Sequence, residues 1–187
     1  MLTFLKKHSS IISRLMITQL GMAIFGLTVT LAATAFNTSN NREDPLMILV
    51  ASGFSILFYL FLLAFAANEA GIRDQIRIEA GRMEKDAYLG LKWGLAANVI
   101  NFLFAAVIIV TYYLTLSLDS GATKTIYATC YTIAKLIQGP YIGVMSVFSP
   151  DNPVIFAFVP IPGILASGLG YFLGLKGFML LPEKRKK

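Results

Sequence analysis

Long apolar stretches are the feature that most constrains how this chain can fold. Four of them occupy residues 15–36, 46–67, 89–116 and 154–181. A helix needs about 20 mainly apolar residues to cross the hydrocarbon core of a bilayer. The sequence therefore predicts an all-α integral membrane protein, a polytopic helical bundle in which these stretches are the four main spans.

Composition favours the same class. The chain has 187 residues, of which 56% are hydrophobic and 14% are charged. An ordinary soluble domain has roughly 45–50% apolar and about 25% charged residues. The length suits a single transmembrane domain over residues 1–187, with four to six spans.

A charged segment, residues 71–88, separates the second and third apolar stretches. Its charged residues are Arg73, Asp74, Arg77, Glu79, Arg82, Glu84, Lys85 and Asp86. Apolar residues recur at helical spacing at Ile72, Ile76, Ala80 and Met83. This pattern indicates one apolar helix face with opposite charges at neighbouring turns. We expect an amphipathic helix that forms the cytoplasmic connector between two spans.

The segment 123–149 is ambiguous, because it is moderately apolar but is interrupted by Gly139-Pro140. A full crossing here would give five spans and would place the basic C-terminus outside, against the tendency of basic residues to stay inside. An outer surface helix or a broken, re-entrant segment keeps both termini cytoplasmic. In that arrangement Arg42, Lys124 and Lys135 are the only basic residues on the outer side of the membrane. A six-span chain would have to split residues 154–181 into pieces too short to cross. We expect four main spans in a multi-pass protein of the cell membrane.

Basic residues near the two chain ends predict contacts with anionic lipids. These residues are Lys6, Lys7, Arg14, Lys184, Arg185, Lys186 and Lys187. No aromatic stacking pattern accompanies them, so nucleic acid is not an expected partner. Small residues on single helix faces, such as Ala166, Gly170 and Gly174, predict close helix packing. A protein partner or a second copy of the chain is expected to use these faces.

Four polar residues in apolar surroundings are the candidate ligand-binding residues. Asn98 and Asn101 lie on one face of the third stretch, where they either contact a ligand or hold helices together. Lys135 and Gln138 precede the Gly139-Pro140 break. A broken helix at membrane depth is tolerated where it lines a cavity or is buried in protein. The alternative is a surface helix from which Lys135 reaches water.

The sequence contains no catalytic signature, and its single Cys130 and single His8 cannot make a Cys/His metal site. We therefore expect no catalytic residues, no metal and no cofactor, and a protein that is not an enzyme. The sequence favours a non-enzymatic subunit of a larger membrane assembly. The alternative is a small-solute transporter, or the substrate-binding membrane component of one.

Overall fold

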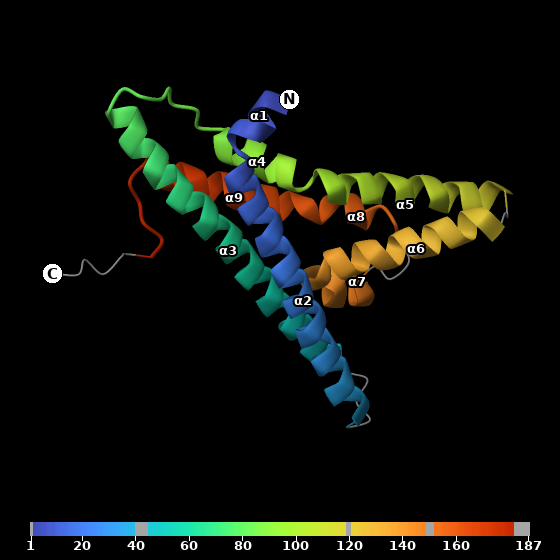
Figure 1. Cartoon of the computed structure of the whole chain (residues 1–187). Helices are drawn as coiled ribbons and strands as arrows, with labels where there is room; N and C mark the ends of the chain where they lie inside the picture. Colours follow the sequence, from blue (N-terminus) through green and yellow to red (C-terminus); the bar gives the residue numbers. More distant parts are fainter. Residues whose placement is uncertain (1, 40–44, 119–120, 149–151, 182–187) are drawn as a thin grey trace. The chain divides into compact units, whose positions relative to one another are not determined.

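The computed structural model describes residues 2–39, 45–118, 121–148 and 152–181. Throughout these ranges the regular structure is helical, and no strand occurs in them. The helices are α1 (Leu2–Lys7), α2 (Ser9–Ser39), α3 (Leu46–Glu79), α4 (Leu89–Ala97), α5 (Val99–Leu118), α6 (Gly121–Ile137), the 3₁₀ helix η1 (Gly139–Tyr141), α7 (Ile142–Phe148), α8 (Ile155–Phe158) and α9 (Pro160–Leu175) (Figure 1). The expected lipid-contact residues Lys184, Arg185, Lys186 and Lys187 lie outside the described residues.

Four helical segments of the described chain are long and apolar enough to cross a membrane. They are Ser9–Ser39, Leu46–Glu79, Val99–Leu118 and Ile155–Leu175. Each overlaps one of the four apolar stretches of the sequence. The all-helical class and the four long apolar helices are thus confirmed.

Helix α3 continues beyond the apolar stretch and includes the first half of the charged connector. Its 34 residues extend for about 51 Å at 1.5 Å per residue, well beyond the roughly 30 Å of a hydrocarbon core. The helix ends because Gly81 adopts a positive φ of 68°. The N–H of Arg82 bonds the carbonyl of Arg77, and that of Gly81 bonds Ile78, as in a Schellman motif. The amphipathic helix expected over 71–88 therefore stops at Glu79.

The chain divides into two compact units, which are described separately. Unit 1 comprises Met1–Thr18, Leu60–Ala97 and Ile161–Lys187, and unit 2 comprises Gln19–Tyr59 and Asn98–Pro160. Each unit is assembled from segments that are distant in the sequence.

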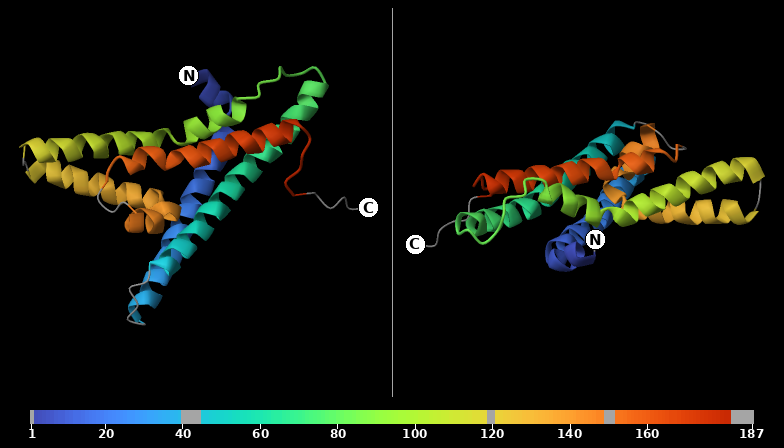
Figure 2. Two further views of the ribbon diagram at one scale, coloured as in Figure 1. Left: turned by 180° about the vertical axis from the view of Figure 1, so that it is seen from behind. Right: turned by 90° about the horizontal axis from the view of Figure 1, so that it is seen from above.

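Close backbone contacts hold unit 1 together. A side chain at Gly170 would overlap the backbone of Ala64 on α3, and one at Gly174 would overlap that of Asn68. Helices α4 and α9 lie side by side (Figure 2), with Gly94 against Ile164. These small residues let helix backbones approach closely. Part of the small-residue face expected to bind a partner is therefore buried within the unit.

Polar side chains of α3 join the same contact. The Asn68 amide donates to the carbonyls of Gly170, at 3.1 Å, and Phe178, at 2.9 Å. It accepts from the N–H of Leu180 at 3.2 Å. The Tyr171 hydroxyl donates to the Asp74 carboxylate at 3.2 Å. The C-terminal segment is thereby fixed to α3 by side-chain bonds as well as by packing.

Unit 2 has its own apolar core. Its buried members are Ala105, Ile108, Ala134, Met145, Phe156 and Val159. Helices α5 and α6 lie side by side (Figure 2). The core joins α5 through α8, so the segment 123–149 packs on the apolar stretch that precedes it.

Candidate functional site: a polar cavity at interrupted helices

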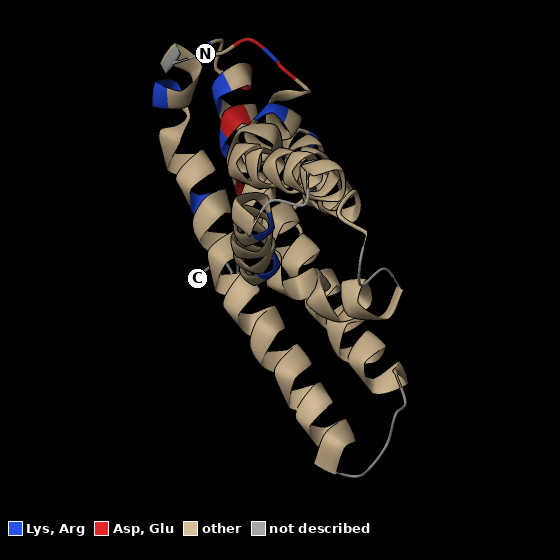
Figure 3. Ribbon diagram, turned by 90° about the vertical axis from the view of Figure 1, so that its right-hand side faces the viewer, with Lys and Arg blue, Asp and Glu red and all other residues tan. Residues whose placement is uncertain are grey.

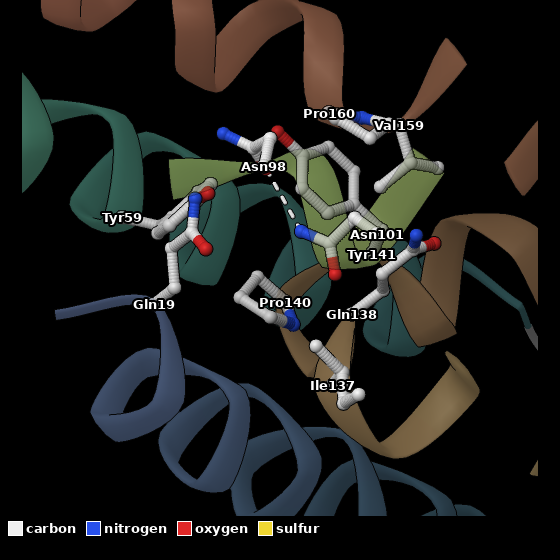
Figure 4. Close-up of a pocket in the computed structure, with 10 residues that line it drawn as sticks. All are labelled: Gln19, Tyr59, Asn98, Asn101, Ile137, Gln138, Pro140, Tyr141, Val159 and Pro160. Atoms are coloured by element: carbon white, nitrogen blue, oxygen red, sulfur yellow. Dashed lines mark hydrogen bonds between the residues drawn. The ribbon is translucent and has the colours of Figure 1, made fainter. Parts of the chain in front are cut away.

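Two interruptions of helical structure meet at one small cavity in unit 2. They fall at Asn98, between α4 and α5, and at Gln138, between α6 and η1. Val159 and Pro160, where α8 continues into α9, also line the cavity. All ten lining residues belong to unit 2 (Figure 4). They are Gln19, Tyr59, Asn98, Asn101, Ile137, Gln138, Pro140, Tyr141, Val159 and Pro160. We call this site the polar cavity.

The Gly139-Pro140 dipeptide causes the second interruption. Pro140 has no backbone N–H and cannot continue an α-helix without losing a hydrogen bond. Gly139 lies against the backbone of Ala23 on α2, where a side chain would not fit. Gly26, one turn further on, leaves equivalent room for Pro140. The break is therefore seated on a small-residue face of α2.

Ser52 on α3 satisfies backbone groups that the break leaves without helical partners. Its hydroxyl donates to the carbonyl of Pro140 at 2.8 Å and accepts from the N–H of Val144 at 3.2 Å. Ser52 is fully buried. A buried backbone group without a partner is costly, so this single side chain stabilises the transition from η1 to α7.

The two asparagines bind each other. Asn101 Nδ2 donates to Asn98 Oδ1 at 2.8 Å, as the dashed line in Figure 4 shows. Both side chains are buried. Their spacing of three residues places them on one helix face. This pairing satisfies part of their hydrogen-bonding capacity without a second helix.

Two glutamines supply buried polar atoms that remain unpaired. Gln19 is 8% exposed and Gln138 is 4% exposed. Within the described chain, Gln19 Nε2, Gln138 Oε1 and the Tyr141 hydroxyl have no hydrogen-bond partner. Both glutamines line the polar cavity, and Gln19 lies beside Tyr59 (Figure 4). The cavity thus combines an unused donor with an unused acceptor.

The size and charge of the cavity restrict what it can hold. Its volume is about 10 Å³, which is close to the least that one water molecule requires. Among the described residues that line it, none is Asp, Glu, Lys or Arg. An isolated ion in such surroundings would lack a compensating charge. The arrangement is therefore suited to a neutral species that both donates and accepts hydrogen bonds.

The structure brings together three of the four residues singled out from the sequence. Asn98, Asn101 and Gln138 line the polar cavity. Lys135 does not: its Nζ lies 4.3 Å from the centre of the Tyr131 ring on α6. Sequence reasoning did not identify Gln19. The available signal was that Gln19 is the sole carboxamide in the apolar stretch 15–36.

Tyr59 and Tyr141 were also missed, because tyrosines are common in apolar stretches and neither stands out by spacing. In the part of the chain that the structure describes, no three His, Cys, Asp or Glu side chains gather as a metal site would require. Comparisons of the chain with protein-family models, with curated proteins and with solved structures give no match. The function is therefore inferred from the residues and geometry of this chain.

Proposed function

We propose that this chain is a multi-pass membrane protein whose polar cavity binds a small neutral polar solute during transport across the membrane. One observation carries the proposal: two helix interruptions and two unpaired glutamine atoms meet at one cavity. Interrupted helices at membrane depth occur where they line a cavity or are buried, and transporters use them to form substrate sites. The second of the two functions expected from the sequence is thus the better supported.

The chemistry of the cavity specifies the solute class. Gln19 Nε2 would donate to a solute acceptor, and Gln138 Oε1 would accept from a solute donor. The described part of the lining has no charged residue, which favours an uncharged amide or hydroxyl compound. Because the cavity now encloses about 10 Å³, it must widen to admit such a solute.

A subunit role in a larger membrane assembly is the alternative and has weaker support. It was inferred partly from small-residue faces that could bind a partner. Gly90, Gly94, Gly170 and Gly174 instead adjoin other segments of unit 1. Copurification of a stoichiometric protein from native membranes would favour this alternative. Under either function, we propose that the protein is not an enzyme.

Flux through reconstituted vesicles tests the transport proposal. Vesicles containing the protein should swell in formamide, urea or glycerol faster than protein-free vesicles, and should show no gain with ammonium or chloride salts. Gln19→Leu and Gln138→Leu should each lower the flux at least about tenfold, the effect of one lost hydrogen bond to a bound group. Gln75→Leu is the matched control, because Gln75 bonds Glu79 on α3 outside the cavity. Equal flux in all three variants would refute the proposal.

We also propose that the protein lies in the cell membrane with both termini in the cytoplasm. The distribution of basic residues in the sequence supports this orientation. With Cys130 replaced by Ser, single cysteines at Ser39 and Ser149 should react with an impermeant thiol reagent in intact cells. A cysteine at Lys186 should be protected. Labelling at Lys186 or protection at Ser149 would reverse the orientation of the last span.

A further inference from the structure

A second cavity, in unit 1, is lined by cationic side chains. It has a volume of about 460 Å³ and includes Lys7, His8, Arg14, Arg73, Arg77 and Trp93 in its lining. These residues come from the chain before and within the first turns of α2, from α3 and from α4. Figure 3 shows that charged segments of unit 1 gather near α1, the start of α2 and the end of α3. We call this cavity the basic groove.

The positive charge of the groove is only partly compensated. Arg14 forms an ion pair with Glu69, and Arg77 lies 3.4 Å from the Asp74 carboxylate. Within the described residues, Lys7 and Arg73 have no carboxylate partner; Arg73 Nε reaches the backbone carbonyl of Glu69 at 3.4 Å. Asp74 is the sole acidic residue among the described residues of the lining. The groove therefore has an excess of cationic donors.

Trp93 contributes its aromatic ring to the wall of the same groove. Its side chain is 2% exposed, and no described residue accepts a hydrogen bond from its Nε1–H. The ring is held between His8, at 5.5 Å between ring centres, and Tyr171, at 4.9 Å. The groove therefore has an aromatic wall beside its cationic side chains.

We propose that the basic groove binds a phosphate group, carried either by an anionic lipid or by a free phosphorylated solute. Guanidinium groups match the planar, bidentate geometry of phosphate oxygens, and an ammonium adds a point charge. The Trp93 ring forms part of the wall beside these groups. Ile11 and Met83, which also line the groove, offer apolar contacts to the remainder of the ligand. The volume lies within the range of about 300–1,000 Å³ typical of small-molecule sites. The inference does not depend on the transport proposal.

Trp93 is the single tryptophan of the chain, so its fluorescence reports on the groove directly. The full-length protein in neutral detergent is titrated with inorganic phosphate, with short-chain phosphatidic acid, and with the diacylglycerol of equal chain length. Phosphatidic acid should change the fluorescence saturably, whereas diacylglycerol should not. An equal response to inorganic phosphate identifies a free phosphate ligand. A response to phosphatidic acid alone identifies a lipid head group.

Matched variants separate a built site from general charge attraction. Arg73→Gln should raise the dissociation constant about tenfold, the effect of losing one charge-assisted bond. Arg82→Gln removes the same charge from a residue that is exposed like Arg73 but lies outside the lining. It should change the dissociation constant less than about twofold, because an exposed charge that does not contact the ligand contributes little. Three results would each overturn the proposal: equal weakening by both variants, an equal response to diacylglycerol, or no saturable response to either phosphate compound.

Discussion

The Ser52 hydroxyl and the Pro140 carbonyl, 88 residues apart in the sequence, form a buried hydrogen bond of 2.8 Å. The same hydroxyl accepts a hydrogen bond from the N–H of Val144. One side chain thereby supports the helix interruption that brings Gln138 to the polar cavity. The integrity of the cavity depends on this contact between α3 and the η1–α7 segment.

Ser52→Ala is expected to destabilise the protein by about 1–3 kcal/mol, because it removes the partner of the buried Pro140 carbonyl and of the partly buried Val144 N–H. Ser55→Ala is the matched control on the same helix. Its hydroxyl bonds only the carbonyl of Ala51 in its own helix, so its loss should cost less than about 1 kcal/mol. Unfolding in mixed detergent micelles measures both. Equal losses would show that the bonds of Ser52 to η1 and α7 contribute nothing.

Asn98→Leu and Asn101→Leu are each expected to cost about 0.6–2 kcal/mol, the range for polar contacts between membrane helices. Because the two amides bond each other, the double variant should cost less than the sum by at least about 0.5 kcal/mol. Asn101→Leu combined with Ser39→Ala, at the distant end of α2, should be additive. Additivity of the asparagine pair would contradict their direct bond.

Gly170→Ala is expected to lower the free energy of unfolding by about 1–3 kcal/mol, because the added methyl group would overlap the Ala64 backbone. Gly53 is a suitable control, since a methyl group there meets nothing within 4 Å. Gly53→Ala should instead stabilise helix α3 by up to about 1 kcal/mol. Thermal unfolding in detergent separates the two. A tolerated Gly170→Ala would mean that α9 and α3 do not approach this closely.

The thermal stability of the protein is expected to fall as the pH is lowered through the range in which His8 titrates. Burial lowers the pKa of His8 below its usual value; the Lys7 ammonium acts in the same sense, and the Asp74 carboxylate opposes both. The unfolded chain therefore binds a proton more readily, so this contribution is fully present above about pH 6.5 and decreases below it. His8→Phe, which keeps an aromatic ring beside Trp93, should reduce the loss of Tm between pH 7.5 and pH 5.5. If His8→Phe leaves this loss of Tm unchanged, groups other than His8 cause the fall in stability.

The sequence predicted the main helices because apolar length alone determines them. Its weakest prediction concerned where helices stop. Gly81 ends α3 within the charged connector, and Gly177 ends α9 in the same manner, with a φ of 76°. Both glycines are visible in the sequence, but periodicity extends past them. A glycine after the last periodic residue is the better indication of a helix end.

The cavity was predictable in part. Asn98, Asn101 and Gln138 stand out because carboxamides are costly in apolar surroundings. Their convergence with Gln19 did not follow from the sequence, since it depends on the close seating of Gly139 on α2. Lys135 precedes the break by only a few residues, yet it lies over the Tyr131 ring instead. The face that a broken helix presents cannot be deduced from spacing across the break.

The bonds between α3 and the C-terminal segment imply an order of events during synthesis. Asn68 bonds Gly170 and Phe178, which follow by 102 and 110 residues. Asp74 lies near Arg77 within α3 but accepts its other bond from Tyr171, 97 residues later. A ribosome therefore releases α3 into its surroundings long before these polar groups can be matched. Until α9 emerges, the nascent chain carries the Asn68 amide without these partners, the kind of feature that quality-control proteases and chaperones can recognise. Chains stalled before residue 170 should be short-lived in cells, even though three of the four long apolar helices are already complete.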